Sequence, residues 1–384
     1  MKIGIVCYPT YGGSGVVATE LGKALAEKGH EVHFIAYRPP ARLDSFHENI
    51  FFHEVRFADY PLFEYAPYES ALASKLVDVV KFEKLDVLHV HYAIPHAATA
   101  YMAKQILKTE NINIPVITTL HGTDITLVGR DITYLPVVTF SINQSDGVTA
   151  VSESLRKETY EHFNISKEIQ VIPNFVDFDR FKRANKDHFK KAIAPQGEKL
   201  LIHTSNFRKV KRVEDVVKMF SIVNKEVPSK LLLVGDGPER QPIEQFCRQI
   251  DMCEDIRFLG KQEAVEELLA IADLFVLPSE SESFGLAALE AMACHVPVIS
   301  SNAGGLPEIN IEGETGFLSN VGDAEDMAQK ALILLKDEEL LQRFKDNAFA
   351  QAQKFDVKHI MPQYEAYYEL IIEKVKQKQV LQNL

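Results

Sequence analysis

Short apolar runs alternate with stretches of helical periodicity along the first half of the chain. Between the first two runs, Val17, Leu21 and Leu25 recur every four residues and Gly29 follows as a stop signal, which predicts one amphipathic helix. A strand, a helix and a strand in succession predict a parallel sheet with crossover helices. The expected strands of this half are residues 3–7, 32–36, 87–90, 116–120 and 148–151.

The second half repeats this plan, which predicts a second doubly wound domain. Between the halves, residues 178–199 are charged and irregular, as is typical of a connection between domains, and we place the boundary near residue 175. We therefore expect an α/β protein with domains at 1–175 and 176–355. The expected strands of the second domain are residues 200–203, 231–234, 256–259, 274–277 and 296–300.

The carboxyl-terminal tail has helical spacing in Tyr364, Tyr368 and Ile371 before it becomes polar. We expect one helix from about residue 356 to 384 that packs back on the first domain and frays at its end.

Composition and charge restrict the class of protein. With 384 residues, of which 46% are hydrophobic and 25% charged, the chain is long enough for two cores. Its formal net charge of -12 argues against a nucleic-acid or anionic-membrane binder, because either surface would repel it. An anionic ligand would need a local group of basic residues.

The chain carries no recognisable targeting or disulfide pattern. Its first apolar run is too short for a secretory core and nowhere do 18 apolar residues follow one another, so we expect a cytoplasmic protein without an integral membrane segment. The cysteines form no CxxC pair, which indicates neither a disulfide framework nor a structural zinc site. They are Cys7, Cys247, Cys253 and Cys294.

A glycine-rich loop, Gly12-Gly13-Ser14-Gly15, follows the first expected strand and leads into the first helix. Glycines let the backbone approach an anion, and a helix N-terminus supplies free amides. Gly13, Gly15 and Ala18 fit the dinucleotide fingerprint, yet the second strand ends at Ala36-Tyr37-Arg38 without the acidic residue that would hold a ribose. NAD binding is therefore disfavoured, and a tight turn without a ligand remains the alternative.

A basic loop, Ser205-Asn206-Phe207-Arg208-Lys209-Val210-Lys211-Arg212, follows the first strand of the second domain. Four cations within five residues at the carboxyl end of a strand suit a diphosphate, whereas a merely solvated run of charge is the alternative.

The most specific segment is residues 278–292, in which Ser283 is placed to cap a helix that starts at Phe284. The amides of Phe284, Gly285 and Leu286 would then point at an anion. Further along, Glu290 lies among apolar residues at helical spacing, so its carboxylate needs a buried partner such as the adjacent hydroxyls of a ribose or hexose.

These segments resemble the family-four retaining glycosyltransferases of GT-B fold. The similarity rests on two glutamates separated by seven residues, Glu282 and Glu290, on the glycine-rich and basic loops, and on two turns, Val234-Gly235-Asp236-Gly237-Pro238 and Gly304-Gly305-Leu306-Pro307-Glu308. It spans nearly the whole chain. The resemblance implies two Rossmann-like domains facing across a cleft, with the acceptor bound by the first and the nucleotide sugar by the second.

The resemblance also implies roles for individual residues. Glu290 would bind the nucleotide ribose, Glu282 would lie near the transferred sugar, and Lys211 would hold the diphosphate. Asn206 stands where the family has an arginine, which leaves the second phosphate ligand open between Asn206 and Arg208. Catalytic residues are thus expected at Lys211, Glu282 and His121, and donor contacts at Gly13, Ser14, Asn206, Arg208, Lys211, Gly235, Glu282, Ser283, Phe284, Gly285, Leu286 and Glu290.

Within the family, residues 89–96, 119–124 and 205–212 are most similar to members that transfer N-acetylglucosamine from UDP-N-acetylglucosamine to L-malate at the start of bacillithiol synthesis. This narrower likeness implies those two substrates and no cofactor. An acceptor with two carboxylates would be met by Ser14, Tyr92, Thr123 and Arg130, which lie in loops of the first domain. A homodimer is a further expectation.

His89 and His91 share one face of a strand, as metal ligands would, but no carboxylate or cysteine accompanies them at ligand spacing, and we expect no metal there. Other functions stay open from the residues alone. They are a family-four enzyme with another acceptor, an NADP-dependent oxidoreductase using Gly13, Gly15 and Arg38, a non-catalytic sugar-nucleotide sensor, and a sugar-nucleotide epimerase.

Overall fold

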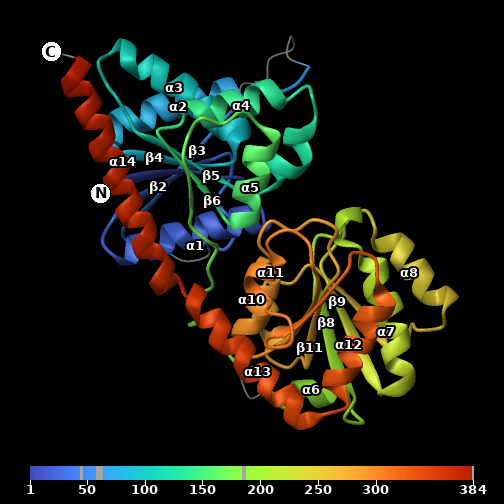
Figure 1. The fold of residues 1–384 in the computed structure, drawn as a ribbon. Coiled ribbons are helices and arrows are strands. Elements are labelled where there is room, and N and C mark those ends of the chain that lie inside the picture. Colours follow the sequence, from blue (N-terminus) through green and yellow to red (C-terminus); the bar gives the residue numbers. More distant parts are fainter. Residues whose placement is uncertain (44–45, 58–63, 184–186, 383–384) are drawn as a thin grey trace. The chain divides into compact units, whose positions relative to one another are not determined.

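Two all-parallel sheets organise the chain in the computed structural model (Figure 1). The structure describes residues 1–43, 46–57, 64–183 and 187–382, without the side chains of Leu127, Arg130, Asp187 and Gln382. These residues form two units. Unit 1 contains residues Met1–Asn174 and Val357–Leu384, and unit 2 contains Phe175–Asp356.

Unit 1 is built on a seven-stranded sheet of order β3-β2-β1-β4-β5-β6-β7. Helices α2 and α3 cover one face and α1 the other (Figure 1). The strands are β1 (Lys2–Val6), β2 (Glu31–Ala36), β3 (Ile50–Glu54), β4 (Val87–His91), β5 (Val116–Leu120), β6 (Gly147–Ala150) and β7 (Ile169–Val171). The helices are α1 (Gly13–Glu27), α2 (Tyr68–Glu83), α3 (Ala98–Thr109), α4 (Leu135–Gln144), α5 (Glu153–His162) and α14 (Val357–Gln382).

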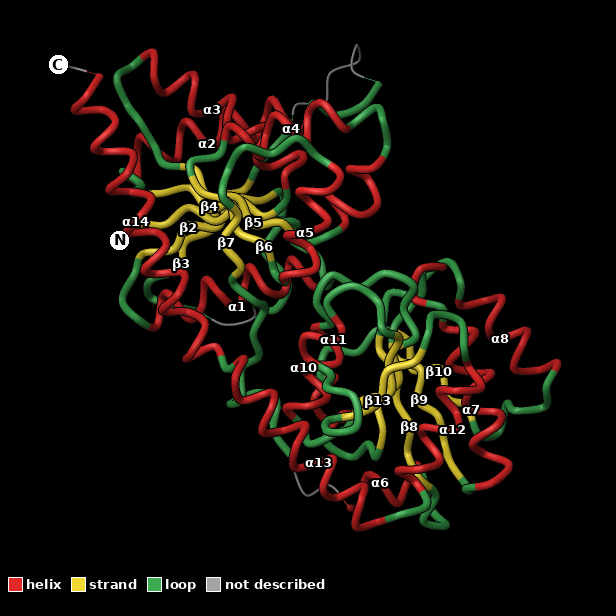
Figure 2. The backbone as a smooth tube through the Cα atoms, in the orientation of Figure 1, coloured by secondary structure: helices red, strands yellow, loops and turns green. Residues whose placement is uncertain are grey.

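Unit 2 has a six-stranded sheet of order β10-β9-β8-β11-β12-β13, and Figure 2 shows its strands side by side with helices around them. Its strands are β8 (Lys199–Thr204), β9 (Ser229–Val234), β10 (Ile256–Gly260), β11 (Leu274–Leu277), β12 (Val298–Ser301) and β13 (Gly316–Ser319). Its helices are α6 (Asp187–Ile193), α7 (Val213–Glu226), α8 (Arg240–Gln249), α9 (Val265–Leu269), α10 (Leu286–Ala293), α11 (Leu306–Ile309), α12 (Ala324–Leu335) and α13 (Glu338–Ala352).

The ten expected strands are confirmed within one or two residues at their ends, but three further strands were missed. Strand β3 lies at the sheet edge and has no fully buried residue, β7 has three residues, and β13 begins at a glycine. None of the three contains a long run of β-branched residues. Each forms because it pairs with a neighbouring strand that is already in place, which the local sequence does not show. The connection at residues 178–199, expected to be irregular, also contains the short helix α6.

Helix α1 begins at Gly13, and Gly29 just beyond its end has a φ of 84°, the left-handed conformation that a helix stop requires. Helix α14 belongs to unit 1, where Tyr368 Oη lies 2.8 Å from His89 Nδ1 and Tyr367 Oη accepts from Val148 N at 2.9 Å. Among the described helices, none combines the length and apolar character needed to cross a bilayer.

Candidate active site

The strand orders place a topological switch point in each unit. In unit 1, β2 and β4 lie on opposite sides of β1, and in unit 2, β9 and β11 lie on opposite sides of β8. In open parallel sheets, ligands bind beyond the carboxyl ends of the strands where the order reverses. The loops after β1 and β4, and after β8 and β11, are therefore the candidate sites.

In unit 2, the two loops at the switch point are joined by an ion pair. Lys211 Nζ, beyond β8, lies 2.6 Å from Glu282 Oε2, beyond β11. Both side chains are largely buried, with exposed fractions of 20% and 16%. Ser279 Oγ donates to the same Glu282 oxygen at 3.3 Å, and Glu280 N donates to Val210 O at 2.8 Å, which ties the loop backbones together. The structure thus brings together the two charged residues that the sequence analysis singled out.

The loop that carries Glu282 is held against the Gly304-Gly305 turn. Gly305 N donates to Glu282 O at 2.8 Å. A Cβ atom at Gly304, whose φ is 56°, would lie 2.0 Å from that same carbonyl oxygen. A side chain at this position would therefore displace the Glu282 backbone. The glycine turn is in this way part of what positions the carboxylate.

The expected helix start at Phe284 is wrong. Helix α10 begins at Leu286, and its N-cap is Gly285, with a φ of 98° and no side-chain cap hydrogen bond. Phe284 is buried, with its ring 5.7 Å from that of Phe355. Packing of this ring keeps Phe284 outside the helix. The N-cap residue that follows has a left-handed backbone conformation, which favours glycine. Ser283 is half-buried one residue before Phe284 and does not cap α10.

Glu290 lies in the middle of α10 with 8% of its surface exposed, which rules out a solvent-facing glutamate. Its neighbours on the helix, Ala288, Leu289 and Ala291, are fully buried. A carboxylate in such surroundings is stable only with hydrogen-bonding or charged partners.

The four cations of the basic loop separate into two kinds. Lys211 pairs with Glu282, and Arg212 Nε lies 2.5 Å from Asp215 Oδ2 in the first turn of α7. Arg208 and Lys209 are exposed and form no ion pair within the described residues. Asn206 is likewise exposed. Arg212 is thus engaged in anchoring α7, and Arg208 has the exposure of a cation that binds a ligand.

Gly235 follows β9 beside this loop. Its amide donates to Gly260 O at 2.8 Å, and a Cβ atom there would lie 1.8 Å from Ser205 O. The turn after β9 and the basic loop after β8 therefore pack backbone to backbone.

In unit 1, Gly13 and Ser14 form the first turn of α1, where helix amides are free, and Gly13 is exposed. Tyr8 in the loop after β1 and Tyr92 after β4 meet edge to face across the switch point, with ring centroids 5.6 Å apart. Tyr8 also lies against His96 at 4.6 Å. Tyr8 is not among the residues predicted from the sequence, although its position directly after the expected strand 3–7 of a doubly wound domain is a signal for a site residue.

Four histidines of unit 1, at positions 89, 91, 96 and 121, make hydrogen bonds inside the fold. His91 Nδ1 lies 2.7 Å from His121 Nε2, and His96 Nδ1 lies 2.6 Å from His91 O. His89 uses both ring nitrogens, toward Tyr368 Oη at 2.8 Å and Thr119 Oγ1 at 2.6 Å. Because both nitrogens are engaged, His89 has no lone pair to offer a metal in this arrangement.

Burial keeps these imidazoles neutral near pH 7. It lowers the pKa of His89 and of His121 to about 3, with the neighbouring His121 and His96, respectively, adding to the effect. Burial also lowers the pKa of His96 to about 4, against the opposing hydrogen bond to His91 O. A neutral His121 can donate or accept one hydrogen bond to a sugar hydroxyl.

Asp124 joins the two loops that follow β4 and β5. Its carboxylate accepts from Ala93 N at 2.8 Å, from Gly122 N at 3.0 Å and from His121 N at 3.3 Å. Burial raises its pKa to about 6, against the lowering effect of these amides. Asp124 lies within the segment 119–124 but is not among the predicted site residues, because its partners come together only in the folded chain.

Two further residues predicted to bind the acceptor, Thr123 and Arg130, follow β5. Thr123 begins the short helix that follows β5 and is half-buried. The backbone of Arg130 is in a short 3-10 helix, and its side chain lies outside the described residues.

Among the described residues, the group with metal-ligand spacing is His33, His53 and Glu83, which lies on β2, β3 and the end of α2.

Two doubly wound domains in one chain, with charged loops at the switch point of the second, have the architecture of a glycosyltransferase of GT-B fold. The chain belongs to glycosyltransferase family 4. Residues 11–180 match the model described as Glycosyltransferase Family 4, and residues 184–351 match that described as Glycosyl transferases group 1.

The chain is 50% identical over 374 residues to N-acetyl-alpha-D-glucosaminyl L-malate synthase of Bacillus anthracis, with 97% of each chain covered. Two solved structures share its fold. Sucrose-phosphate synthase from Thermosynechococcus elongatus has a TM-score of 0.81 at 21% identity, covering 97% of this chain and 100% of that one. Anabaena Alr3699/HepE in complex with UDP and glucose has a TM-score of 0.82 at 22% identity, covering 96% and 99%.

Proposed function

We propose that this chain transfers N-acetylglucosamine from UDP-N-acetylglucosamine to the hydroxyl of L-malate, with retention at the anomeric carbon, as the first step of bacillithiol synthesis. The observation that carries the proposal is the 50% identity, over 97% of both chains, to the synthase from Bacillus anthracis whose name specifies that product. The buried polar groups at the two switch points support it.

Unit 2 would bind the donor. Lys211 has three N–H donors, so it can keep its contact with Glu282 and still donate to a diphosphate oxygen. Glu282 would orient the lysine and lie near the transferred sugar, and Glu290 would accept from the ribose hydroxyls. Arg208 is better placed than Asn206 for the second phosphate, because it is an exposed cation without an ion pair within the described residues.

Unit 1 would bind the acceptor. Ser14 at the start of α1 suits a carboxylate, and Tyr92 and Thr123 supply hydroxyls at the ends of neighbouring strands. His121 would contact the transferred sugar.

In the reaction, the bond from the anomeric carbon to the diphosphate oxygen breaks and a bond to the malate hydroxyl oxygen forms on the same face. The hydroxyl proton passes to the departing diphosphate, whose charge is stabilised by Lys211.

The test is product analysis. The purified enzyme is incubated with UDP-N-acetylglucosamine and L-malate, and the glycoside is sought by mass spectrometry with its anomeric configuration assigned by NMR. An α-linked N-acetylglucosaminyl malate supports the proposal. Release of UDP only with other hydroxy acids would assign a different acceptor, and absence of UDP release with any acceptor would overturn transfer from this donor.

We further propose a cytoplasmic homodimer. The cysteines are free thiols, as in a reducing compartment, and both proposed substrates are intracellular metabolites.

Helices α3 and α4 expose large apolar side chains, namely Met102, Ile106, Val137 and Phe140, each between 41% and 47% exposed. On a protein of net charge -12, such a face favours a second copy of the chain over an anionic membrane. Light scattering of the native protein and of Phe140→Glu, expected to be monomeric, tests this.

A further inference from the structure

The amino-terminal half of β2, the edge strand β3 and the end of α2 bring two histidines and a glutamate together at one side of unit 1. His33, His53 and Glu83 each present a ligand atom, and these atoms all lie within 4.8 Å of one another. We propose that this cluster is a binding site for a divalent transition-metal ion, with Zn²⁺ as the best match. The site is separate from the proposed transferase residues.

The sheet register explains how residues 20 positions apart meet. His33 on β2 pairs with Phe51 on β3, and His53 is two residues beyond Phe51. Alternate residues of a strand share a face, so both imidazoles point to the same side of the sheet. Their nearest nitrogens, His33 Nδ1 and His53 Nε2, are 2.9 Å apart. Two ligands of a tetrahedral zinc ion are separated by about 3.3 Å, so a small opening of this pair would accommodate the metal.

The hydrogen bond between the two rings does not satisfy the cluster. His33 is fully buried, and its Nε2 has no hydrogen-bond partner among the described residues. Glu83 forms no ion pair within the described part of the chain, although Lys81 two residues earlier pairs with Glu110 at 2.6 Å. Within the described residues, Glu83 is therefore available as the ligand that completes the pair of histidines.

The charge state of the cluster suits a cation. Burial, and to a smaller extent the neighbouring His53, lowers the pKa of His33 to about 4. Burial also lowers the pKa of His53, although Glu83 opposes the effect on both rings. The neutral imidazole is the form of histidine that binds a metal, and two histidines with one glutamate are a known zinc ligand set.

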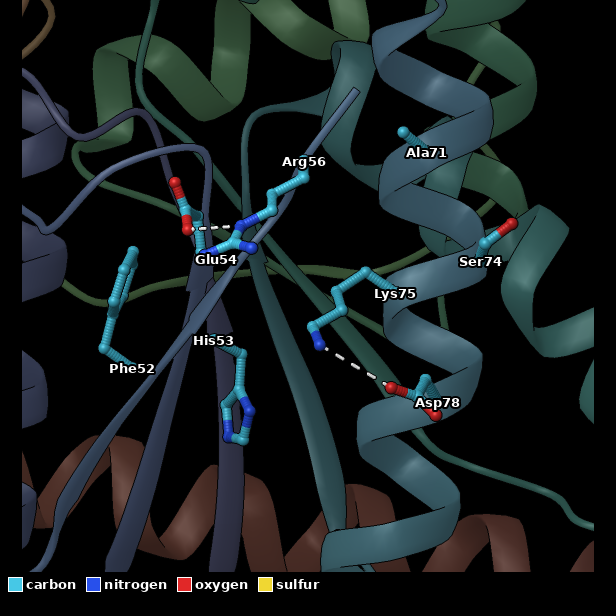
Figure 3. A pocket seen from close by; sticks show the side chains of 8 residues that line it. All are labelled: Phe52, His53, Glu54, Arg56, Ala71, Ser74, Lys75 and Asp78. Atoms are coloured by element: carbon cyan, nitrogen blue, oxygen red, sulfur yellow. Dashed lines mark hydrogen bonds and ion pairs between the residues drawn. The ribbon is translucent and has the colours of Figure 1, made fainter. Parts of the chain in front are cut away.

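A surface pocket gives an ion access to His53. The pocket lies between β3 and α2, has a volume of about 750 Å³, and is lined by His53 together with Glu54, Arg56, Lys75 and Asp78 (Figure 3). Its cations are already neutralised, because Arg56 Nε lies 2.7 Å from Glu54 and Lys75 Nζ lies 3.5 Å from Asp78 (Figure 3). His53 and Glu83 are partly exposed, so the ion would reach the cluster without unfolding of the sheet.

The test uses the full-length, untagged protein after treatment with a chelator, because an added histidine tag would bind zinc itself. Zn²⁺ is titrated in competition with a chromogenic chelator, and bound metal is counted by mass spectrometry after desalting. His53→Ala and Glu83→Gln are the test variants, since both positions are partly exposed and tolerate change. His162→Ala, an exposed histidine of the same unit, is the matched control.

We expect one equivalent of Zn²⁺ and a rise in the melting temperature of the native protein. The affinity should fall on the order of tenfold to a hundredfold in His53→Ala and Glu83→Gln, and stay unchanged in His162→Ala. Co²⁺ should give the visible absorption of a tetrahedral site that is lost in the same two variants. No bound equivalent, or equal binding by all variants, would overturn the proposal whatever the transferase activity.

Discussion

Lys211 and Glu282 lie 71 residues apart in the sequence, and their side chains meet at 2.6 Å across the switch point of unit 2. One follows β8 and the other β11, the two strands from which the sheet is wound in opposite directions. The pair therefore sets a cation where a doubly wound sheet binds anions. The proposed donor site depends on this relationship.

Replacing Lys211 by alanine should reduce turnover by on the order of a hundredfold or more, because its charge stabilises the diphosphate as it leaves. Steady-state UDP release measures the effect. Lys209→Ala is the matched control, since Lys209 is an exposed cation of the same loop without an ion pair in the described chain. Equal activity of the two variants would remove Lys211 from the site.

Replacing Glu290 by glutamine should weaken UDP binding by about 1.5–3 kcal/mol, because two charge-assisted hydrogen bonds to the ribose become neutral ones. Isothermal titration calorimetry with UDP measures this loss. Glu280→Gln is the control, because Glu280 is an exposed carboxylate two residues before Glu282. Native affinity in Glu290→Gln would show that the ribose is held elsewhere.

Replacing Tyr92 by phenylalanine, or Thr123 by valine, should raise the KM for L-malate and leave the KM for the sugar nucleotide nearly unchanged, because the proposed sites for the two substrates are in different units. Kinetics with each substrate varied in turn separate the two constants. Tyr65→Phe, at a position 80% exposed, controls for loss of a tyrosine hydroxyl. An equal effect on both substrates, or none on malate, would exclude this placement.

Stability should fall as the pH is lowered below about 6.5, the unfolded-state pKa of histidine. Burial lowers the folded-state pKa of His89 and His121 to about 3 and of His96 and His203 to about 4. Such groups bind fewer protons when folded, so acid favours the unfolded chain down to those values. At about pH 5, each of these histidines would lower the free energy of unfolding by up to about 2 kcal/mol.

Asp124 acts in the opposite direction. Its folded-state pKa of about 6 lies above the unfolded value, so acid stabilises the folded chain as the pH falls through 6 toward about 4. The stabilisation from one carboxylate is smaller than the destabilisation from four histidines, so the free energy of unfolding falls as the pH is lowered. Urea unfolding near pH 7 and near pH 5 measures it, and His89→Gln should reduce the difference. Equal unfolding free energies at the two pH values would contradict the burial of these imidazoles as neutral groups.

Sequence alone determined the two doubly wound domains, because a buried parallel strand needs a continuous apolar run and its crossover helix needs one apolar face, and both are local patterns. The basic loop and Glu290 could also be chosen from the sequence, since charges beside a buried strand or within an apolar helix are conspicuous, and the family resemblance selected Lys211 and Glu282. The tertiary structure alone decided that Lys211 pairs with Glu282 while Arg212 is used by Asp215.

Other features of the fold were likewise decided by tertiary contacts and not by the local sequence. Edge strand β3 and the left-handed start of α10 at Gly285 depend on neighbours that the local sequence does not contain: a formed β2 for the strand, and Phe355 packed on Phe284 for the helix. The same holds for the approach of Tyr8 to Tyr92 and for the meeting of His33, His53 and Glu83. Such contacts join residues distant in sequence through sheet register and packing, and no local pattern encodes a distance across a sheet.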